Sequence, residues 1–341
     1  MKIIYVFPYL SSYSIVGELK TKALRKMDHK VLMFDDRLPR MSLLRISPRV
    51  CNVLKHKINY FKDKDILLMN RDLIQVAKQF KPDLLLVDKG TDIVFGTIEK
   101  INTLGVITAN WFSDNLDHLD WMKKAIKTYK YFFHFDSYVV SLLKESGADN
   151  VYHIPFGCDI ELHKTIILSE EDRKKYECDV CFAGAYTPER ENLLLNLTDF
   201  NLKIYGYRNW QSSKLRSFYQ GTITNDIELT KLYNSCKIAI NYHYKYTGDG
   251  ANVRTFEIVG CGGALQIVDY RKDILRFFEE NKEIVVFKNV KELKEKVKYY
   301  LENEEERQAI TKRCQEKAYK EHTLDKRMAN LMEIIKRKEG L

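Results

Sequence analysis

The sequence predicts an α/β protein with two Rossmann-like domains, each a doubly wound parallel sheet, that face each other across a cleft. Short runs rich in Val, Ile and Leu alternate with segments of helical periodicity, which is typical of parallel strands joined by helical crossovers. The alternation pauses in a polar stretch at residues 157–177 and then restarts. The chain of 341 residues is long for one hydrophobic core and sufficient for two.

The first domain is expected at residues 1–156, where strands and helices take turns. Strands are predicted at residues 3–7, 30–34, 84–87, 106–110 and 151–155, with a further apolar run at 132–140. Helices are predicted at residues 15–26, 67–80 and 92–104. In the helix at 67–80 the apolar residues recur every three or four positions, as they do on one face of a helix.

The second domain is expected at residues 178–320, after a linker at 157–177. Its strands are predicted at residues 179–183, 202–205, 238–242, 264–269 and 284–287. Its helices are predicted at residues 189–197, 226–235 and 274–280, with another from about 253 and charged helices from 290 onward. Residues 321–341 are expected to form a separate C-terminal helix with an apolar stripe for packing.

The composition is that of an ordinary soluble globular protein, with 45% hydrophobic and 30% charged residues. No apolar run approaches the roughly 18 residues that a membrane-spanning helix needs. The first residues have too short an apolar stretch for a signal peptide, and no small-residue cleavage pattern follows. Seven scattered cysteines lack zinc-site spacing. We therefore expect a cytoplasmic protein with reduced thiols.

A basic stretch at residues 37–64 stands out from the net charge of +9. It holds eight Lys or Arg residues against one acid, among recurring Leu, Ile and Val. One interpretation is a solvated helix face packed on the domain. Another is a surface that binds anionic lipid or an acidic acceptor, which would place the protein peripherally on the inner face of the membrane. Nucleic acid is not expected, because no zinc-finger, RNP-type or basic-zipper pattern accompanies the charge.

The segment 246–263 carries the pattern most suggestive of chemistry. It reads as the end of a strand, a loop with Gly248 and Gly250, and a short helix from Val253. The N-terminus of such a helix offers unpaired N–H groups and a positive dipole to an anion. Arg254 adds a planar fork suited to phosphate, and Glu257 suits a ribose diol. The alternative is a solvated i,i+3 ion pair, although the apolar residues after Glu257 favour burial.

This segment resembles the donor-binding element of GT-B glycosyltransferases, because the Asp249-x7-Glu257 spacing is similar to their Glu-x7-Glu motif. Within that fold, the Asn252-x-Arg254-x-Phe256-Glu257 core resembles the spore-maturation-protein (CgeB-like) glycosyltransferase family. Similar segments occur in family order at 81–90, 110–114, 179–184, 204–206 and 322–327. Asp249 departs from the Glu of many GT-B enzymes and is shorter by one methylene.

The resemblance implies a donor-binding second domain, an acceptor-side first domain, and a last helix that returns to the first domain. It also implies metal-independent transfer from a nucleotide-diphosphate sugar, of the hexosyl and retaining type. The residues themselves also favour metal-independent transfer, since no convincing Asp-x-Asp metal-binding element follows a strand. Arg254, Arg190 and two helix N-termini could neutralise the leaving diphosphate instead. No cofactor is expected beyond the donor substrate.

Strand ends nominate the remaining residues, because ligands of open α/β sheets bind beyond the carboxyl ends of strands. At one such end, Thr187 is a candidate N-cap and Pro188 opens a helix, so that Arg190 could contact the diphosphate. A solvated surface role for Arg190 is the alternative. The predicted donor-binding residues are Gly184, Arg190, Tyr205, Gly206, Gly250, Asn252, Arg254 and Glu257.

The predicted catalytic residues are Asp114, which follows a strand of the first domain, and Asp249. Asp114 could act as the base for an acceptor hydroxyl, or it could simply cap the next segment. Lys89 follows another strand of the first domain and is a candidate for binding an acceptor anion or the donor phosphate.

The sequence therefore favours a glycosyltransferase that moves a sugar to a hydroxyl of a glycan, glycolipid or protein, as in the synthesis of cell-surface polysaccharide. Two alternatives stay open. One is a nucleotide-sugar epimerase on the same fold, and the other is a non-catalytic carbohydrate-binding coat protein. The residues leave the donor base, the transferred sugar, the acceptor and the choice between retaining and inverting transfer open.

Overall fold

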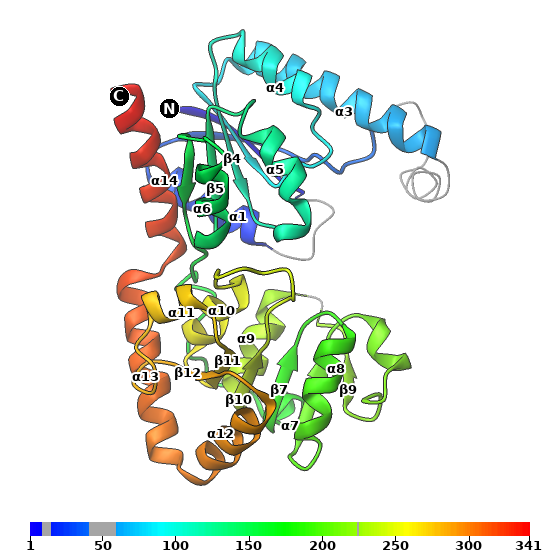
Figure 1. The fold of residues 1–341 in the computed structure, drawn as a ribbon, viewed down its shortest axis with the longest axis vertical. Helices are drawn as coiled ribbons and strands as arrows, with labels where there is room; N and C mark the ends of the chain where they lie inside the picture. Colours follow the sequence, from blue (N-terminus) through cyan, green and yellow to red (C-terminus); the bar gives the residue numbers. More distant parts are fainter. Residues whose placement is uncertain (9–14, 41–58, 224) are drawn as a thin grey trace. The chain divides into compact units, whose positions relative to one another are not determined.

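The protein folds into two compact units, each built around one parallel sheet. The computed structural model describes residues 1–8, 15–40, 59–223 and 225–341. Unit 1 comprises Met1–Ile154 and Met328–Leu341, and unit 2 comprises Pro155–Arg327. Each unit contains a six-stranded sheet with flanking helices (Figure 1). The predicted fold class, two doubly wound parallel α/β sheets, is confirmed.

The sheet of unit 1 has the strand order β2-β1-β3-β4-β5-β6, and every neighbouring pair is parallel. Its strands are β1 (Lys2–Val6), β2 (Lys30–Phe34), β3 (Leu84–Asp88), β4 (Ile107–Phe112), β5 (Tyr131–His134) and β6 (Val151–His153). Residues 84–87 are completely buried, because helices cover both faces of the sheet. This burial explains why the strands appear in the sequence as continuous apolar runs.

The helices of unit 1 are α1 (Val16–Lys26), α3 (Asn59–Phe80), α4 (Phe95–Asn102), α5 (Leu119–Ala125), α6 (Ser137–Glu145) and most of α14 (Leu324–Glu339). The apolar run at 132–140 is two elements, since Asp136 interrupts it. The Asp136 carboxylate caps α6 by accepting a hydrogen bond of 3.0 Å from the backbone N–H of Tyr138. Near the end of α14, Glu339 pairs with Lys130 at 2.7 Å.

The basic stretch at 37–64 is described only at its two ends. Arg45, Arg49, Lys55 and Lys57 lie outside the described residues. Arg40 is buried, and its guanidinium donates to the carbonyl oxygens of Leu38 and Asp35, both at 2.6 Å. At least one base of this stretch therefore serves the interior of unit 1 and not a binding surface.

The sheet of unit 2 has the order β12-β11-β10-β7-β8-β9 and is also parallel throughout. Its strands are β7 (Cys178–Ala183), β8 (Leu202–Tyr205), β9 (Tyr219–Gly221), β10 (Cys236–Asn241), β11 (Leu265–Asp269) and β12 (Val285–Phe287). Strand β9 was not predicted, because the strand is only partly buried and its three residues form no apolar run.

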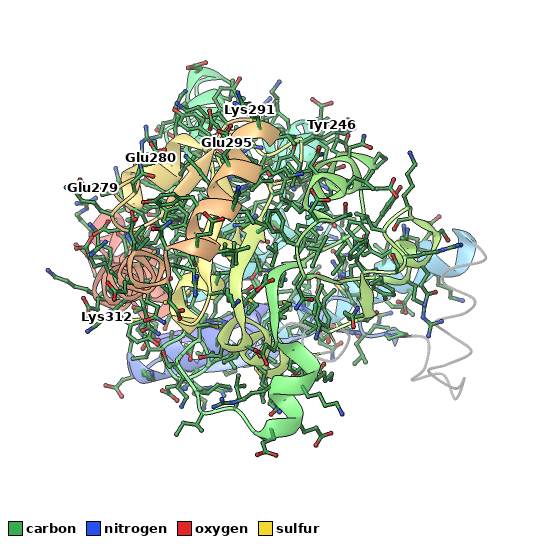
Figure 2. All side chains as sticks on the ribbon, turned by 90° about the horizontal axis from the view of Figure 1, so that it is seen from below. Tyr246, Glu279, Glu280, Lys291, Glu295 and Lys312 are labelled. Carbon is green, nitrogen blue, oxygen red and sulfur yellow. The ribbon has the colours of Figure 1, made fainter. Side chains whose placement is uncertain are left out.

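The helices of unit 2 are α7 (Glu170–Tyr176), α8 (Pro188–Leu194), α9 (Asp226–Ser235), α10 (Val253–Cys261), α11 (Lys272–Phe277), α12 (Val290–Glu302) and α13 (Glu304–Glu321). They bury one face each. On α12, for example, Leu293 and Val297 are buried, whereas Lys291 and Glu295 lie at the surface (Figure 2). No helix in the described ranges is both long and apolar enough to span a membrane.

Residues 157–177, expected to be a linker, are folded into unit 2 and contain helix α7. Ser169 caps α7 by accepting a hydrogen bond of 3.1 Å from the backbone N–H of Asp172. Tyr176 is buried in a cluster with Tyr205 and residues of α9. This segment reads as polar in the sequence because only one side of α7 packs on the unit.

Each sheet has one point at which the chain changes direction. In unit 2 the chain runs outward from β7 to β8 and β9, and then returns to β10 on the other side of β7. In unit 1 the corresponding point lies between β1 and β3. Ligands of doubly wound sheets bind at such switch points, beyond the carboxyl ends of the strands.

Candidate functional site

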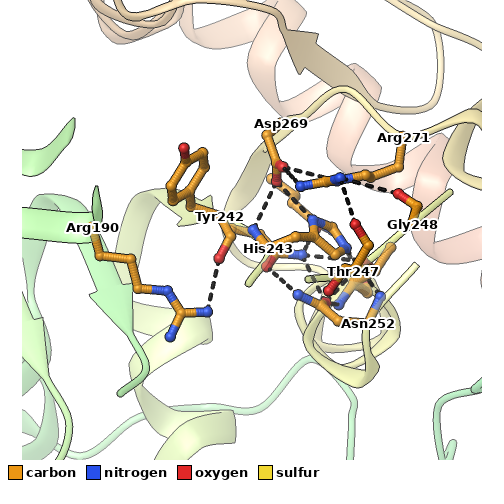
Figure 3. A network of polar contacts seen from close by, with 11 residues as sticks. Arg190, Tyr242, His243, Thr247, Gly248, Asn252, Asp269 and Arg271 are labelled. Carbon is orange, nitrogen blue, oxygen red and sulfur yellow. Dashed lines mark hydrogen bonds and ion pairs between the residues drawn. The ribbon is translucent and has the colours of Figure 1, made fainter. Parts of the chain in front are cut away.

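Arg190 spans the switch point of unit 2. The hydroxyl of Thr187 accepts a hydrogen bond of 3.2 Å from the Arg190 backbone N–H, and Pro188 opens α8, as predicted from the sequence. The two terminal nitrogens of the guanidinium donate to the carbonyl oxygens of Ala185 and Tyr242, both at 2.9 Å (Figure 3). One side chain thus joins the loop after β7 to the residue that follows β10.

Both partners of the Arg190 guanidinium are neutral carbonyl oxygens. Among the described residues it forms no ion pair, and its buried Nε has no hydrogen-bond partner. Burial lowers the pKa of Arg190, and the Asp269 carboxylate acts in the opposite direction. An arginine remains charged at neutral pH in such a setting. The switch point therefore holds a fixed cation whose charge no bound carboxylate cancels.

The N-terminus of α10 lies after the neighbouring strand end and is rigidly capped. The Asn252 side-chain oxygen accepts a hydrogen bond of 2.9 Å from the backbone N–H of Thr255. The Asn252 amide group also donates to Asn241, the last residue of β10, at 2.9 Å. The side chain predicted to contact the donor is therefore used to fix the start of the helix.

Arg254 and Glu257 form an ion pair on the first turns of α10. It is not the solvated pair of the alternative interpretation, because the Glu257 side chain is only 5% exposed and that of Arg254 25%. Burial acts most strongly and lowers the pKa of Arg254, but the combined effects of Glu257, Tyr233 and Asp226 outweigh it and raise the pKa. Unlike Arg190, Arg254 has its charge balanced by an adjacent carboxylate.

Asp249 and Gly250 lie in the loop between β10 and α10. The Asp249 carboxylate accepts a hydrogen bond from the Lys272 amino group at 3.1 Å. The backbone carbonyl oxygen of Asp249 accepts one from the Asp273 backbone N–H, also at 3.1 Å. Gly250 is buried. The start of α11 therefore supports the middle of this loop.

Sequence reasoning missed the polar cluster that holds the same loop. His243, Asp269 and Arg271 are not among the residues predicted from the sequence. In the structure these three residues join the end of β11 to both ends of the segment 247–252 (Figure 3). Asp269 is the last residue of β11, so the strand-end rule would have found it.

Gly184 and Gly206 allow the loops after β7 and β8 to approach each other. A Cβ atom on Gly206 would lie 2.1 Å from the Gly184 carbonyl oxygen, so no other residue fits there. Tyr205 is buried, and its hydroxyl donates to the Lys175 carbonyl oxygen at 3.3 Å. The Tyr205 side chain thus serves the core of unit 2, while the two glycines shape its strand-end loops.

In unit 1, the two predicted residues do come together. The Asp114 carboxylate forms an ion pair with Lys89 and lies 3.3 Å from the His118 ring nitrogen Nε2. Lys89 has φ of 61°, a left-handed conformation that is uncommon for a residue with a side chain. His118 was not nominated from the sequence, although it follows Asp114 by one helical turn.

A second ion pair lies at the switch point of unit 1. The Lys20 amino group is buried, lies 2.5 Å from the Asp88 carboxylate and sits 3.8 Å from the centre of the Trp111 ring. The Tyr5 and Ser113 hydroxyls also donate to Asp88, at 3.0 Å and 3.2 Å. Both lysines at this strand-end region of unit 1 are thus paired with carboxylates.

A cavity of about 930 Å³ in unit 1 contains none of the predicted residues. Its lining includes Met1, Asp83 and Ile107, which lie at the amino ends of β1, β3 and β4. Ligands of this fold bind at the opposite strand ends, so we do not assign the predicted chemistry to this cavity. Within the described ranges, no group of three or more His, Cys, Asp or Glu side chains could hold a metal ion.

Comparisons with known proteins agree with the fold. Residues 190–333 match the family model described as glycosyl transferase-like. No curated protein matches the sequence. Among solved structures, Anabaena HepE in complex with UDP is similar, with 13% identity, a TM-score of 0.64 and coverage of 99% of this chain and 100% of that chain.

Two further solved structures are similar over the same extent. Sucrose-phosphate synthase from Thermosynechococcus elongatus has 10% identity, a TM-score of 0.74 and complete coverage of both chains, 100% and 100%. An E. coli structure described as trehalose-6-phosphate bound with UDP-2-fluoro glucose has 11% identity, a TM-score of 0.67 and coverage of 98% and 99%. This chain therefore has the GT-B fold. The resemblance to the CgeB-like family stays a prediction.

Proposed function

We propose that this protein is a glycosyltransferase that uses a nucleotide-diphosphate sugar as its donor. The observation that carries the proposal is the Arg190 guanidinium, held by two neutral carbonyl groups at the switch point beside the capped N-terminus of α10. A diphosphate needs positive charge and N–H donors at one place, and this strand end supplies both. The UDP and UDP-sugar complexes of the similar structures support the same donor class.

In this proposal different residues of unit 2 bind different parts of the donor. Arg190 and the N–H groups at the start of α10 bind the diphosphate. Glu257 accepts hydrogen bonds from the ribose hydroxyls, while Arg254 holds its carboxylate and adds charge beside the phosphates. Asp249 contacts the transferred sugar, Gly250 belongs to the loop at the diphosphate, and the loops shaped by Gly184 and Gly206 surround the nucleoside.

We propose that the transfer needs no metal ion. Stabilising the leaving nucleoside diphosphate requires positive charge that is fixed before the reaction begins. Arg190 is fixed in this way by two hydrogen bonds to backbone carbonyls, and the helix dipole of α10 adds to its effect.

The acceptor side is proposed to lie in unit 1. Asp114, with Lys89 and His118 around it, is the candidate base for a hydroxyl of a glycan, glycolipid or protein. We further propose a retaining hexosyl transfer that contributes to cell-surface polysaccharide on the cytoplasmic face of the membrane. The basic stretch at 37–64 would then contact anionic lipid.

Donor binding and turnover can be tested separately. Calorimetry with UDP, ADP, GDP and CDP should reveal one preferred nucleotide, with UDP expected. Release of that nucleotide from a panel of its sugars, with and without glycan or glycolipid acceptors, should then reveal transfer. Activity should persist in EDTA. If no nucleoside diphosphate binds, the proposal is wrong, and binding without turnover on any acceptor would indicate a carbohydrate-binding protein instead.

A further inference from the structure

We infer that His243 is a positioning residue of the donor site, which sets the diphosphate-binding loop 247–252 through Asn252 without touching the ligand. This inference rests on the proposed function. His243 follows β10 and is only 2% exposed, so it is not available to solvent or substrate. Its two ring nitrogens nevertheless both have specific partners, on opposite sides of the ring (Figure 3).

The hydrogen bonds define the tautomer of His243. Its Nε2 accepts a hydrogen bond of 3.0 Å from the backbone N–H of Asn252, and a nitrogen that accepts cannot carry a proton. The proton therefore lies on Nδ1, which donates to the Asp269 carboxylate at 2.6 Å. A neutral ring with one donating and one accepting nitrogen is the arrangement that joins a carboxylate to a backbone N–H.

Asp269 connects the hydrogen bonds of His243 to those of Arg271. Its other carboxylate oxygen accepts from the Arg271 guanidinium at 2.9 Å and 3.1 Å. Arg271 in turn donates to the carbonyl oxygens of Thr247 and Gly248, both at 3.0 Å. The hydrogen bonds of Arg271 thus hold the start of the loop, and the hydrogen bond of His243 holds its end.

The end of the loop is the part that matters for a diphosphate. Asn252 is both the residue bound by His243 and the N-cap of α10. The direction of the first free N–H groups of the helix depends on the backbone at this cap. Removal of the Nε2 acceptor would leave the Asn252 N–H without its partner and release the cap from β11.

A buried histidine could also serve only to stabilise the fold, and two conservative variants separate the two roles. Glutamine places an oxygen near Nε2, so His243→Gln keeps the acceptor for Asn252 and loses the donor to Asp269. Asparagine places its amide near Nδ1, so His243→Asn keeps the donor and loses the acceptor. His243→Ala loses both. All three disturb packing, so stability alone does not distinguish them.

The experiment measures the affinities of UDP and of uridine by calorimetry for the wild type and the three variants, with thermal unfolding in parallel. We expect His243→Ala and His243→Asn to lose about tenfold in UDP affinity, which corresponds roughly to the net contribution of one hydrogen bond. His243→Gln should stay within about threefold of the wild type. Uridine affinity should not change in any folded variant.

The inference is overturned if His243→Asn binds UDP as tightly as His243→Gln, or if UDP and uridine weaken equally in His243→Ala. Either result would mean that His243 supports the fold only. Failure of the proposed function gives a different pattern, in which the wild type itself does not bind UDP. If the variants fail to fold, Asn241→Asp and Thr255→Val remove the amide and hydroxyl groups that also donate to the Asn252 side chain, and they should weaken UDP binding more than uridine binding. Unchanged UDP affinity in both would then overturn the inference that this cap sets the diphosphate.

Discussion

The two switch points of this protein hold their cations in opposite ways. In unit 2, the Arg190 guanidinium is held by neutral carbonyl oxygens and forms no ion pair with any described residue. In unit 1, Lys20 is paired with Asp88 and Lys89 with Asp114. A fixed, uncompensated cation attracts an anion, whereas a compensated one organises polar groups around a neutral hydroxyl. Under the proposed function, this difference would suit unit 2 to the donor phosphate and unit 1 to an uncharged acceptor.

The largest effect should come from breaking the buried pair of unit 1. Lys20→Met removes the cation beside Asp88 and should lower the free energy of unfolding by about 3 kcal/mol, because a buried carboxylate loses its partner. Chemical unfolding measures this cost. The double variant Lys20→Met with Asp88→Asn should recover much of the lost stability. A single variant as stable as the wild type would show that the pair is not compensating buried charge.

Asp36 tests the same idea with a carboxylate for which burial outweighs the attraction of the neighbouring Arg37. It is buried, its Oδ1 has no hydrogen-bond partner among the described residues, and burial raises its pKa from 3.8 to about 6. The folded state therefore favours the protonated acid. Its contribution to stability is complete below pH 3.8 and is lost as the pH rises through about 6.

Replacement of Asp36 by Asn removes this titration. Asp36→Asn should therefore be more stable than the wild type at pH 8, by on the order of 2–3 kcal/mol, with a much smaller difference at pH 4. Urea unfolding of both proteins at the two pH values measures it. If the variant instead gains more stability at pH 4 than at pH 8, the predicted direction of the pH dependence is wrong.

Arg190 is the corresponding test in unit 2. Arg190→Ala should weaken UDP by about 2 kcal/mol, or roughly 30-fold, since a charge-assisted interaction with the diphosphate is lost. Arg190→Lys should recover part of this, because lysine keeps the charge and loses the fork. Arg173 on α7 is exposed, and Arg173→Ala is the matched control. Equal UDP affinity in Arg190→Ala and in this control would remove the contrast between the two units.

The strand and helix pattern was readable from the sequence because both sheets are parallel and covered on both faces. Runs such as residues 84–87 and 238–240 are apolar throughout, and helical periodicity lies between them. Elements without a buried apolar run were not readable in this way. Strand β9 is only partly buried, and α7 buries little besides Tyr176. Its residues therefore looked like a linker.

For the candidate site, the sequence indicated the region but not the partners of each side chain. The strand-end rule brought together Arg190, Asn252, Arg254 and Glu257. It could not show that the Arg190 guanidinium donates to carbonyl groups while Arg254 pairs with Glu257, because carbonyl partners belong to the backbone and have no sequence signature. The polar cluster of His243, Asp269 and Arg271 depends on how β10 and β11 pair, which is a property of the tertiary structure.

The smallest effect is expected from the second pair of unit 1. The Lys89 and Asp114 side chains are 34% and 25% exposed, so solvent screens their attraction. Lys89→Ala should therefore change the free energy of unfolding by only about 0.5 kcal/mol and leave UDP affinity within about twofold of the wild type. If Asp114 is the acceptor base, loss of its cation should instead alter turnover at constant donor affinity. A large loss of UDP affinity in Lys89→Ala would show that unit 1 also binds the donor phosphate, and the proposed difference between the two switch points would then be wrong.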